Sequence, residues 1–205
     1  MKLFYSPGAC SLGTHILLEE IGKPYELALV DLRSGAQHKQ EYTSVNPKAK
    51  VPALLRGDGT LLTEWPAIAW YLAKTHPEMG LLPEDVEGEV RAMELIDYMI
   101  ATVHMRGFTR IFRPSAFTPT TADEPAVVQT GRDIVADGFK LLSHALDAKP
   151  YLLGDYSIAD AALFFLELWG AARLKIELPG NLAAHYARMH ARPAVQRALA
   201  AEGLA

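Results

Sequence analysis

The hydrophobic pattern of the first 80 residues alternates between strand-like runs and helix-like spacing. Short apolar runs predict four strands, at residues 2–5, 25–30, 51–55 and 61–63. Apolar residues at steps of three and four predict three helices, at residues 11–21, 37–45 and 65–75. The last two strands flank Arg56-Gly57-Asp58-Gly59, a turn sequence that is typical of a hairpin. The first part of the chain is therefore expected to fold as βαβαββα.

Beyond residue 80 the strand-like runs stop and the spacing is helical. It predicts helices at residues 87–104, 133–148, 159–174, 182–192 and 194–202. The stretch 159–174 is apolar almost all round and is expected to be central and buried, while the proline-rich residues 113–125 are expected to form a loop. Residues 76–87, rich in proline, glycine and acidic side chains, mark the boundary between a domain over 1–80 and an all-helical domain over 87–205.

A capping signal precedes the buried helix. Ser157 can accept a hydrogen bond from the first turn, and Asp160 can accept one from the Ser157 amide, which is the pattern of a capping box. Such a cap contributes about 1 kcal/mol to stability. It is a folding element, and we assign it no chemistry.

The composition excludes several classes of protein. The 205 residues are 50% hydrophobic, enough for a core, and the net charge of −4 gives no basic footprint for nucleic acid. The apolar stretches are shorter than a membrane-spanning helix needs, and the N-terminus lacks the apolar region of a signal peptide. Cys10 is the only cysteine, so no internal disulfide can form. We expect a cytoplasmic protein that binds neither nucleic acid nor membranes.

Cys10 is the most informative residue for function. It follows the first predicted strand and the turn Ser6-Pro7-Gly8-Ala9, and the 11–21 helix begins directly after it. Unpaired N–H groups and the helix dipole favour a thiolate at such a position. We therefore expect a depressed Cys10 pKa and a reactive sulfur. The alternative is a small buried hydrophobe, as most free cysteines are.

Two further positions in the first part point to a ligand. Pro52 opens the third strand, and although most such peptides are trans, a cis proline here in a thioredoxin-like domain turns the backbone of Val51 toward a bound thiol compound. We expect Pro52 to be cis. Glu64 ends the fourth strand beside a helix N-terminus, which binds carboxylates, so the two could hold an amino-acid head group. The alternative is that Thr63 or Glu64 only caps the helix.

Asp97 and His104 are the candidates in the second part. They are seven residues apart on the 87–104 helix, close to two turns, so we expect both to point the same way, beside the apolar stripe of Val90 and Ile96. The alternative is a hydrogen-bonded histidine at a domain interface. The other six histidines form no spaced cluster with carboxylates or cysteine, and no metal site is expected.

Several segments together resemble bacterial beta-class glutathione S-transferases. The most specific surround Cys10, Val51-Pro52 and Ser157–Asp160, and each alone would be weak. The similarity covers essentially the whole chain, through Met1–Leu12, Val45–Leu54, Asp58–Glu64, Tyr71-Leu72, Gly107-Phe108, Phe112–Pro114, Tyr151–Gly154, Arg192–Val195 and Ala201–Leu204. It implies glutathione S-transferase architecture: an α/β thioredoxin-like N-terminal domain, an all-α C-terminal domain, and a homodimer.

The resemblance implies a glutathione site in the first domain. Cys10 would meet the sulfur of glutathione. The backbone of Val51, before Pro52, would pair with the cysteinyl part of the tripeptide. Glu64 and Trp65 would hold the γ-glutamyl end, although the family usually has serine, threonine or glycine at the Trp65 position, and the indole adds bulk.

The second domain is implied to complete the site. Asp97 falls where the family commonly has an amide, and His104 matches the histidine of its fourth helix, so His104 joins Cys10 as a catalytic candidate. Met105-Arg106 makes the chain one residue longer before Gly107-Phe108 than is usual. The implied second substrate is a small hydrophobic electrophile, in a pocket formed by both domains, and no metal is implied.

The glycyl carboxylate of glutathione has no clear partner. The family uses a lysine in the loop after the second strand, but Gly35 falls there in this chain and the loop is one residue shorter. Lys39, His38 or Arg33 could substitute, and we take Lys39 as the candidate.

Three functions remain open. The first is a transferase that conjugates glutathione to an electrophile or reduces a substrate through a Cys10–glutathione mixed disulfide. The second is a glutaredoxin-like thiol transferase with one thiol, because Gly13 stands where a resolving cysteine would fall. The third is a non-catalytic adaptor of the same fold, which Trp65 favours and the intact Cys10, Pro52 and Glu64 oppose.

Overall fold

The computed structural model describes residues 1–205 and divides into two compact units. The first comprises Met1–Leu82 and Arg188–Ala205, and the second comprises Pro83–Ala187. Residues 188–205, which the sequence pattern groups with the second half, lie in the first unit because α9 (Pro193–Ala201) packs against α1 (Ser11–Ile21). No helix combines the length and the apolar character that crossing a membrane requires.

The first unit is built on a four-stranded mixed sheet in the order β2-β1-β3-β4. The strands are β1 (Lys2–Tyr5), β2 (Glu26–Leu29), β3 (Ala53–Leu55) and β4 (Leu61–Thr63). β1 is parallel to β2 and antiparallel to β3, and β3 is antiparallel to β4 across the predicted hairpin. The predicted βαβαββα order is confirmed.

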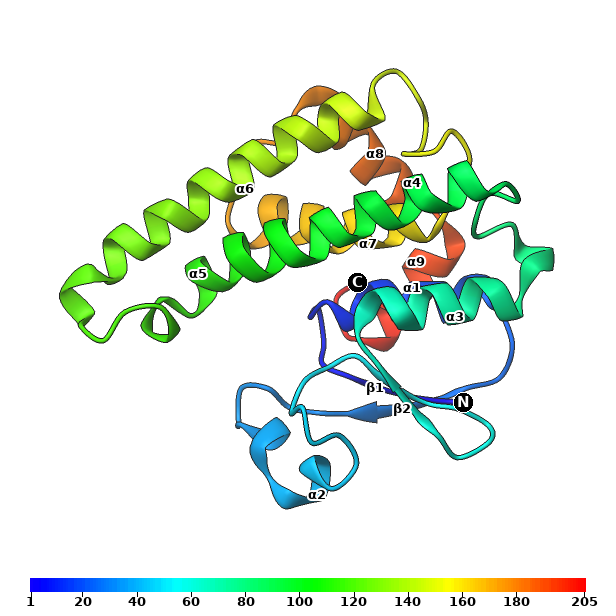
Figure 1. Cartoon of the computed structure of the whole chain (residues 1–205), viewed down its shortest axis with the longest axis horizontal. Coiled ribbons are helices and arrows are strands. Elements are labelled where there is room, and N and C mark those ends of the chain that lie inside the picture. Colours follow the sequence, from blue (N-terminus) through cyan, green and yellow to red (C-terminus); the bar gives the residue numbers. More distant parts are fainter. The chain divides into compact units, whose positions relative to one another are not determined.

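Two helices cover one face of this sheet. α1 and α3 (Trp65–Thr75) pack together on it, and α2 (Gln40–Thr43) lies on the opposite side (Figure 1). The predicted bounds of α1 and α3 are confirmed, and α1 ends at Gly22, whose φ of 69° suits glycine. The single helix expected around α2 is divided into the 3-10 turn η1 (Ala36–His38) and α2, because Lys39 between them is extended.

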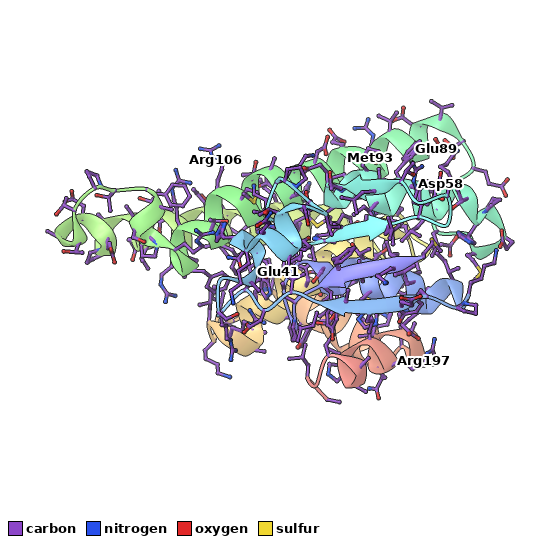
Figure 2. All side chains as sticks on the ribbon, turned by 90° about the horizontal axis from the view of Figure 1, so that it is seen from below. Glu41, Asp58, Glu89, Met93, Arg106 and Arg197 are labelled. Atoms are coloured by element: carbon purple, nitrogen blue, oxygen red, sulfur yellow. The ribbon has the colours of Figure 1, made fainter.

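Charged side chains join α9 to α1. Arg192 Nε lies 2.7 Å from Glu20 Oε1, and Arg197 Nε lies 2.6 Å from Glu19 Oε2. Figure 2 shows the Arg197 side chain on α9. These pairs hold the end of the chain on the helix that begins at Cys10.

The second unit is helical. Its α- and π-helices are α4 (Val86–Asp97), the π-helix η3 (Tyr98–Phe108), α5 (Thr109–Phe112), α6 (Glu124–Leu146), α7 (Ile158–Glu167), the π-helix η6 (Leu168–Arg173) and most of α8 (Gly180–His190). Short 3-10 turns lie at Pro77–Met79, in the first unit, and at Pro114–Ala116 and Thr121–Asp123. α4, η3 and α5 follow one another without a break and lie alongside α6 (Figure 1). Both runs are longer than predicted.

Close approach between η3–α5 and α6 depends on glycine. A Cβ at Gly138 would lie 2.7 Å from Val103 Cγ2, and one at Gly131 would lie 2.8 Å from the Gly107 carbonyl oxygen. Neither position can therefore take a side chain without a shift of its neighbours.

The predicted burial is confirmed for α7 and is wrong for one residue of α4. Every residue of α7 is buried, and the predicted capping box of Ser157 and Asp160 is present. Val90, expected in the buried stripe, is 54% exposed, whereas Ile96 and Val103 are buried. Val90 lies in the first turns of α4, before the π-helix η3 begins, so the wider turns of η3 do not account for its exposure.

Candidate functional site

Cys10 lies where β1 passes into α1, as predicted. It occupies the N-cap position of α1, is partly buried, and its Sγ donates a hydrogen bond to the Val51 carbonyl oxygen at 3.4 Å. The Val51-Pro52 peptide is cis, which confirms that prediction. The cysteine and the cis proline thus come together from segments 41 residues apart in the chain.

The expected depressed pKa of Cys10 is wrong for the protein without ligand. Burial raises the pKa of the thiol to about 12, although the N–H groups of Cys10 and Ser11 and the charge of Lys50 act in the opposite direction. Burial removes the water that would solvate a thiolate, and this outweighs the favourable position at the helix N-terminus. The resting sulfur is a thiol, which agrees with its role as a hydrogen-bond donor.

The loop before Val51 is held by two side chains that sequence reasoning did not single out. Tyr42 Oη and Asn46 Nδ2 both donate to the Lys50 carbonyl oxygen, at 2.6 and 2.8 Å. Ala49 adopts a φ of 54°, a left-handed conformation that costs a non-glycine residue about 1 kcal/mol or more. Together these contacts fix the backbone that presents Val51 to Cys10.

Glu64 is the N-cap residue of α3, but its side chain does not cap the helix. Its carboxylate projects into solvent and meets Lys48, with Nζ 2.7 Å from Glu64 Oε1 and 2.9 Å from Thr63 Oγ1. The Glu64 φ of 70° places the side chain outside the helix and leaves its carboxylate accessible. The simple capping role for Glu64 is therefore excluded.

The Trp65 indole was expected to add bulk where the γ-glutamyl end of glutathione would bind, but it points elsewhere. The residue is only 3% exposed, and its indole Nε1–H donates to the Cys10 carbonyl oxygen at 3.1 Å. The indole is turned into the protein, toward the start of α1. No sequence signal gives the direction of this side chain.

Lys39 lies between η1 and α2, exposed and without an ion pair. Lys50 is also exposed, and its charge acts on the Cys10 sulfur. The structure brings Lys50, rather than Lys39, into electrostatic contact with the sulfur. Lys48 and Lys50 both belong to the segment before Pro52. Two positive charges so close to Pro52 were the feature of the sequence that could have pointed to cations near the sulfur and near Glu64.

The second unit carries Asp97 and His104, and they do not form the pair that was predicted. Asp97 ends α4 and is exposed, whereas the His104 ring packs edge-on against Trp169 and Phe165, with centroids at 4.9 and 5.7 Å. The six residues between them belong to the π-helix η3, so the separation does not amount to two α-helical turns.

Sequence reasoning missed a buried network behind Cys10. Glu202, 5% exposed, accepts a hydrogen bond from the Gly8 N–H at 2.7 Å, and its other oxygen lies 2.9 Å from Nδ1 of the fully buried His15. The loop that leads into Cys10 is thus fixed by a residue near the C-terminus. The two positions are 194 residues apart, and no local pattern connects them.

Comparison with known proteins gives the class. The sequence profile "Glutathione S-transferase, N-terminal domain" matches residues 8–75. The chain is 41% identical over 208 residues to glutathione S-transferase GstA of Escherichia coli O157:H7, across the full length of both. The chain therefore belongs to the glutathione S-transferase family.

Solved structures agree. The bacterial beta-class glutathione S-transferase of Sphingomonas chungbukensis is 35% identical, with a TM-score of 0.85 and complete coverage of both chains. A sphingomonad glutathione S-transferase complexed with glutathione is 34% identical, with a TM-score of 0.82 and complete coverage. The resemblance to the beta class and the glutathione S-transferase architecture are confirmed.

Proposed function

We propose that this chain is a glutathione transferase that holds glutathione along the first unit, with the tripeptide's sulfur at Cys10. The observation that carries the proposal is the grouping of Cys10 Sγ with the backbone of Val51, in a protein whose relatives are glutathione S-transferases. An extended peptide can pair with that backbone while its thiol approaches the cysteine. A solved relative complexed with glutathione supports the same ligand.

The γ-glutamyl end has complementary groups at the start of α3. Its carboxylate would be bound by the N-terminus of the helix at Trp65, and its ammonium by Glu64. In the protein alone Lys48 occupies the Glu64 carboxylate. The ligand's ammonium would replace or share that contact, so binding exchanges one exposed ion pair for another.

Lys39 remains the proposed partner of the glycyl carboxylate, and Lys50 is a second cation available near the sulfur. In the second unit we propose His104 and Asp97 as the groups that complete the glutathione site. The aromatic rings of Phe165 and Trp169, which pack on His104, and those of Phe108 and Phe112, which pack on Trp169, would face a small hydrophobic electrophile. No metal takes part in this scheme.

Two reactions are compatible with the site. In conjugation, the proton of the glutathione thiol is passed to a base or to solvent, and the thiolate then attacks the electrophile. It forms a carbon–sulfur bond either by displacing the electrophile's leaving group or by adding to a polarised double bond, which takes up a proton. In the redox reaction, the Cys10 thiolate attacks oxidised glutathione, which gives the Cys10–glutathione disulfide and releases one reduced glutathione. Cys10→Ala separates them: wild-type conjugation by this variant would restrict Cys10 to redox chemistry.

The proposal is tested by calorimetric titration with glutathione. Glu64→Gln should weaken binding by about 1.5–3 kcal/mol, the scale of a hydrogen bond to a charged group. Glu84→Gln, at an exposed position outside the proposed site, is the matched control and should bind as the wild type does. An unchanged affinity in Glu64→Gln would reject this placement of the γ-glutamyl end, and failure of the wild type to bind would favour the adaptor.

We also propose a homodimer. Val86 and Val90, one turn apart on α4, are 77% and 54% exposed, an apolar surface that a second subunit would cover. Light scattering and activity should be measured together at falling concentration. A fully active species of 22.5 kDa, the mass of one chain, would contradict the dimer.

A further inference from the structure

Trp65 touches both parts of the proposed glutathione site. It is the first residue of α3, directly after Glu64, at the helix end proposed to bind the γ-glutamyl carboxylate. Its indole Nε1–H donates to the carbonyl oxygen of Cys10, the residue that carries the sulfur. At 3% exposure the indole is shielded from water, so water competes little for this hydrogen bond.

The carbonyl that accepts this bond belongs to a peptide group that also acts on the sulfur. The Cys10 carbonyl and the Ser11 N–H are the two ends of one planar peptide unit, so fixing one end fixes the direction of the other. The Ser11 N–H, with the N–H of Cys10 itself, acts to lower the pKa of the Cys10 thiol and so favours its thiolate. A peptide group that accepts a hydrogen bond at its oxygen is polarised and donates more strongly at its N–H.

Few groups oppose the burial of this sulfur. The only others that favour its thiolate are the N–H of Cys10 itself and the charge of Lys50, while the charge of Glu202 disfavours it. The Ser11 N–H is therefore one of the three groups that favour the thiolate against the effect of burial. The Cys10 carbonyl oxygen also accepts the Gly13 N–H at 3.2 Å, and the indole adds a second, side-chain donor at the far end of that peptide.

We propose that Trp65 is a positioning residue for Cys10: its indole N–H holds and polarises the Cys10–Ser11 peptide so that the Ser11 N–H points at the sulfur. The inference rests on the proposed function for the role of Cys10, but the hydrogen bond acts in the protein alone. It also links the two subsites, because a ligand at the start of α3 contacts the residue that supports the sulfur.

The test is the rate at which iodoacetamide alkylates Cys10, measured between pH 7 and pH 9.5 without glutathione. Trp65→Phe keeps an aromatic ring and removes the donor, and should slow alkylation about 1.5- to threefold at each pH, because polarisation through the peptide changes the neighbouring N–H contact by a fraction of its strength. Trp70→Phe makes the same change on the same helix, away from Cys10, and should leave the rate unchanged. An unchanged rate in Trp65→Phe overturns the proposal.

A second variant separates the N–H from packing. Benzothienylalanine placed at position 65 by codon reassignment has the shape of tryptophan with sulfur in place of the N–H. The proposal predicts that it slows alkylation as Trp65→Phe does, and wild-type alkylation in this variant overturns it. A different result would reject the proposed function: absence of glutathione binding by the wild type. That result would not change what the alkylation rates show about Trp65.

Discussion

Each compact unit buries a histidine against carboxylates, and the number of carboxylates differs. In the first unit His15 meets one, Glu202, at 2.9 Å. In the second unit His185 meets two, with Nδ1 at 3.0 Å from Glu167 and Nε2 at 3.2 Å from Asp160. Both histidines are fully buried, and the second carboxylate on His185 is the main difference in buried charge between the two networks.

The first network is connected to the site. The second oxygen of Glu202 accepts the Gly8 N–H at 2.7 Å, and His15 Nε2 lies 2.8 Å from the Tyr25 hydroxyl, which hydrogen-bonds Glu19. The single buried carboxylate is thus satisfied by two donors, one of them in the loop before Cys10. Its role is to fix that loop.

The second network is a concentration of buried charge. Burial alone would lower the pKa of His185, but hydrogen bonds to Asp160 and Glu167, and their charges, raise the pKa to about 9. Burial raises the pKa of Glu167 to about 7, although the contact with His185 lowers it. With two carboxylates and one cation, this network should respond to pH, and its members all lie in the second unit.

Removal of His185 should have the largest effect. His185→Ala leaves Asp160 and Glu167 buried without their cation, and should lower the free energy of unfolding by about 3–5 kcal/mol, measured by urea denaturation. His144→Ala, the same change at an exposed position of α6, should change it by less than about 0.5 kcal/mol. Equal losses in both variants would mean that the buried triad contributes nothing specific.

Stability should fall as pH rises. Glu167 has its pKa raised from 4.5 to about 7, and His185 from 6.5 to about 9, so the folded state binds more protons than the unfolded chain in both windows. The stabilisation by charged His185 is complete below pH 6.5 and is lost through about pH 9, on the order of 3 kcal/mol. Urea midpoints of the wild type at pH 6.5 and pH 9 measure this difference.

A matched variant sharpens the pH prediction. In Glu167→Gln the residue that titrates near pH 7 is gone, and the fall between pH 4.5 and pH 7 should become smaller than in the wild type. An equally steep fall would assign the pH dependence to other groups.

Glu202→Gln should have the smallest effect on stability. The amide keeps the size of the side chain and one acceptor, so a loss of about 1 kcal/mol is expected from the weaker bond to Gly8. Its second consequence is specific: the rate of Cys10 alkylation should change, whereas in His185→Ala the rate per folded molecule should stay that of the wild type. A change of the alkylation rate in both variants would contradict the claim that only the network of the first unit acts on Cys10.

The sequence predicts the elements best where their ends carry local signals. α1 lies between Cys10 and Gly22, and the turn of the hairpin contains Gly57 and Gly59. Both elements are found where they were predicted. The change from α-helix to π-helix after Asp97 was not predicted, because the steps of three and four in the apolar residues do not distinguish the two kinds of helix.

The residues of the site also divide into those that local sequence predicts and those that only the packing of distant segments places. Cys10 and cis Pro52 follow from their positions beside strands, and Glu64 from its place before α3. The direction of Trp65, the Lys48–Glu64 pair and the contact of Glu202 with Gly8 depend on packing between distant segments, which periodicity does not encode. The depressed pKa of Cys10 was wrong because position at a helix end is local, whereas burial is set by the whole unit.

The most direct test of the account is the rate at which oxidised glutathione forms a mixed disulfide with Cys10, followed by mass spectrometry over a range of concentrations. If glutathione is held with its sulfur at Cys10, the rate should saturate, one adduct should form per chain, Cys10→Ala should form none, and Glu64→Gln should need more oxidised glutathione to reach the same rate. A rate that rises linearly with concentration and is identical in Glu64→Gln would show a merely accessible thiol and would contradict the proposed site.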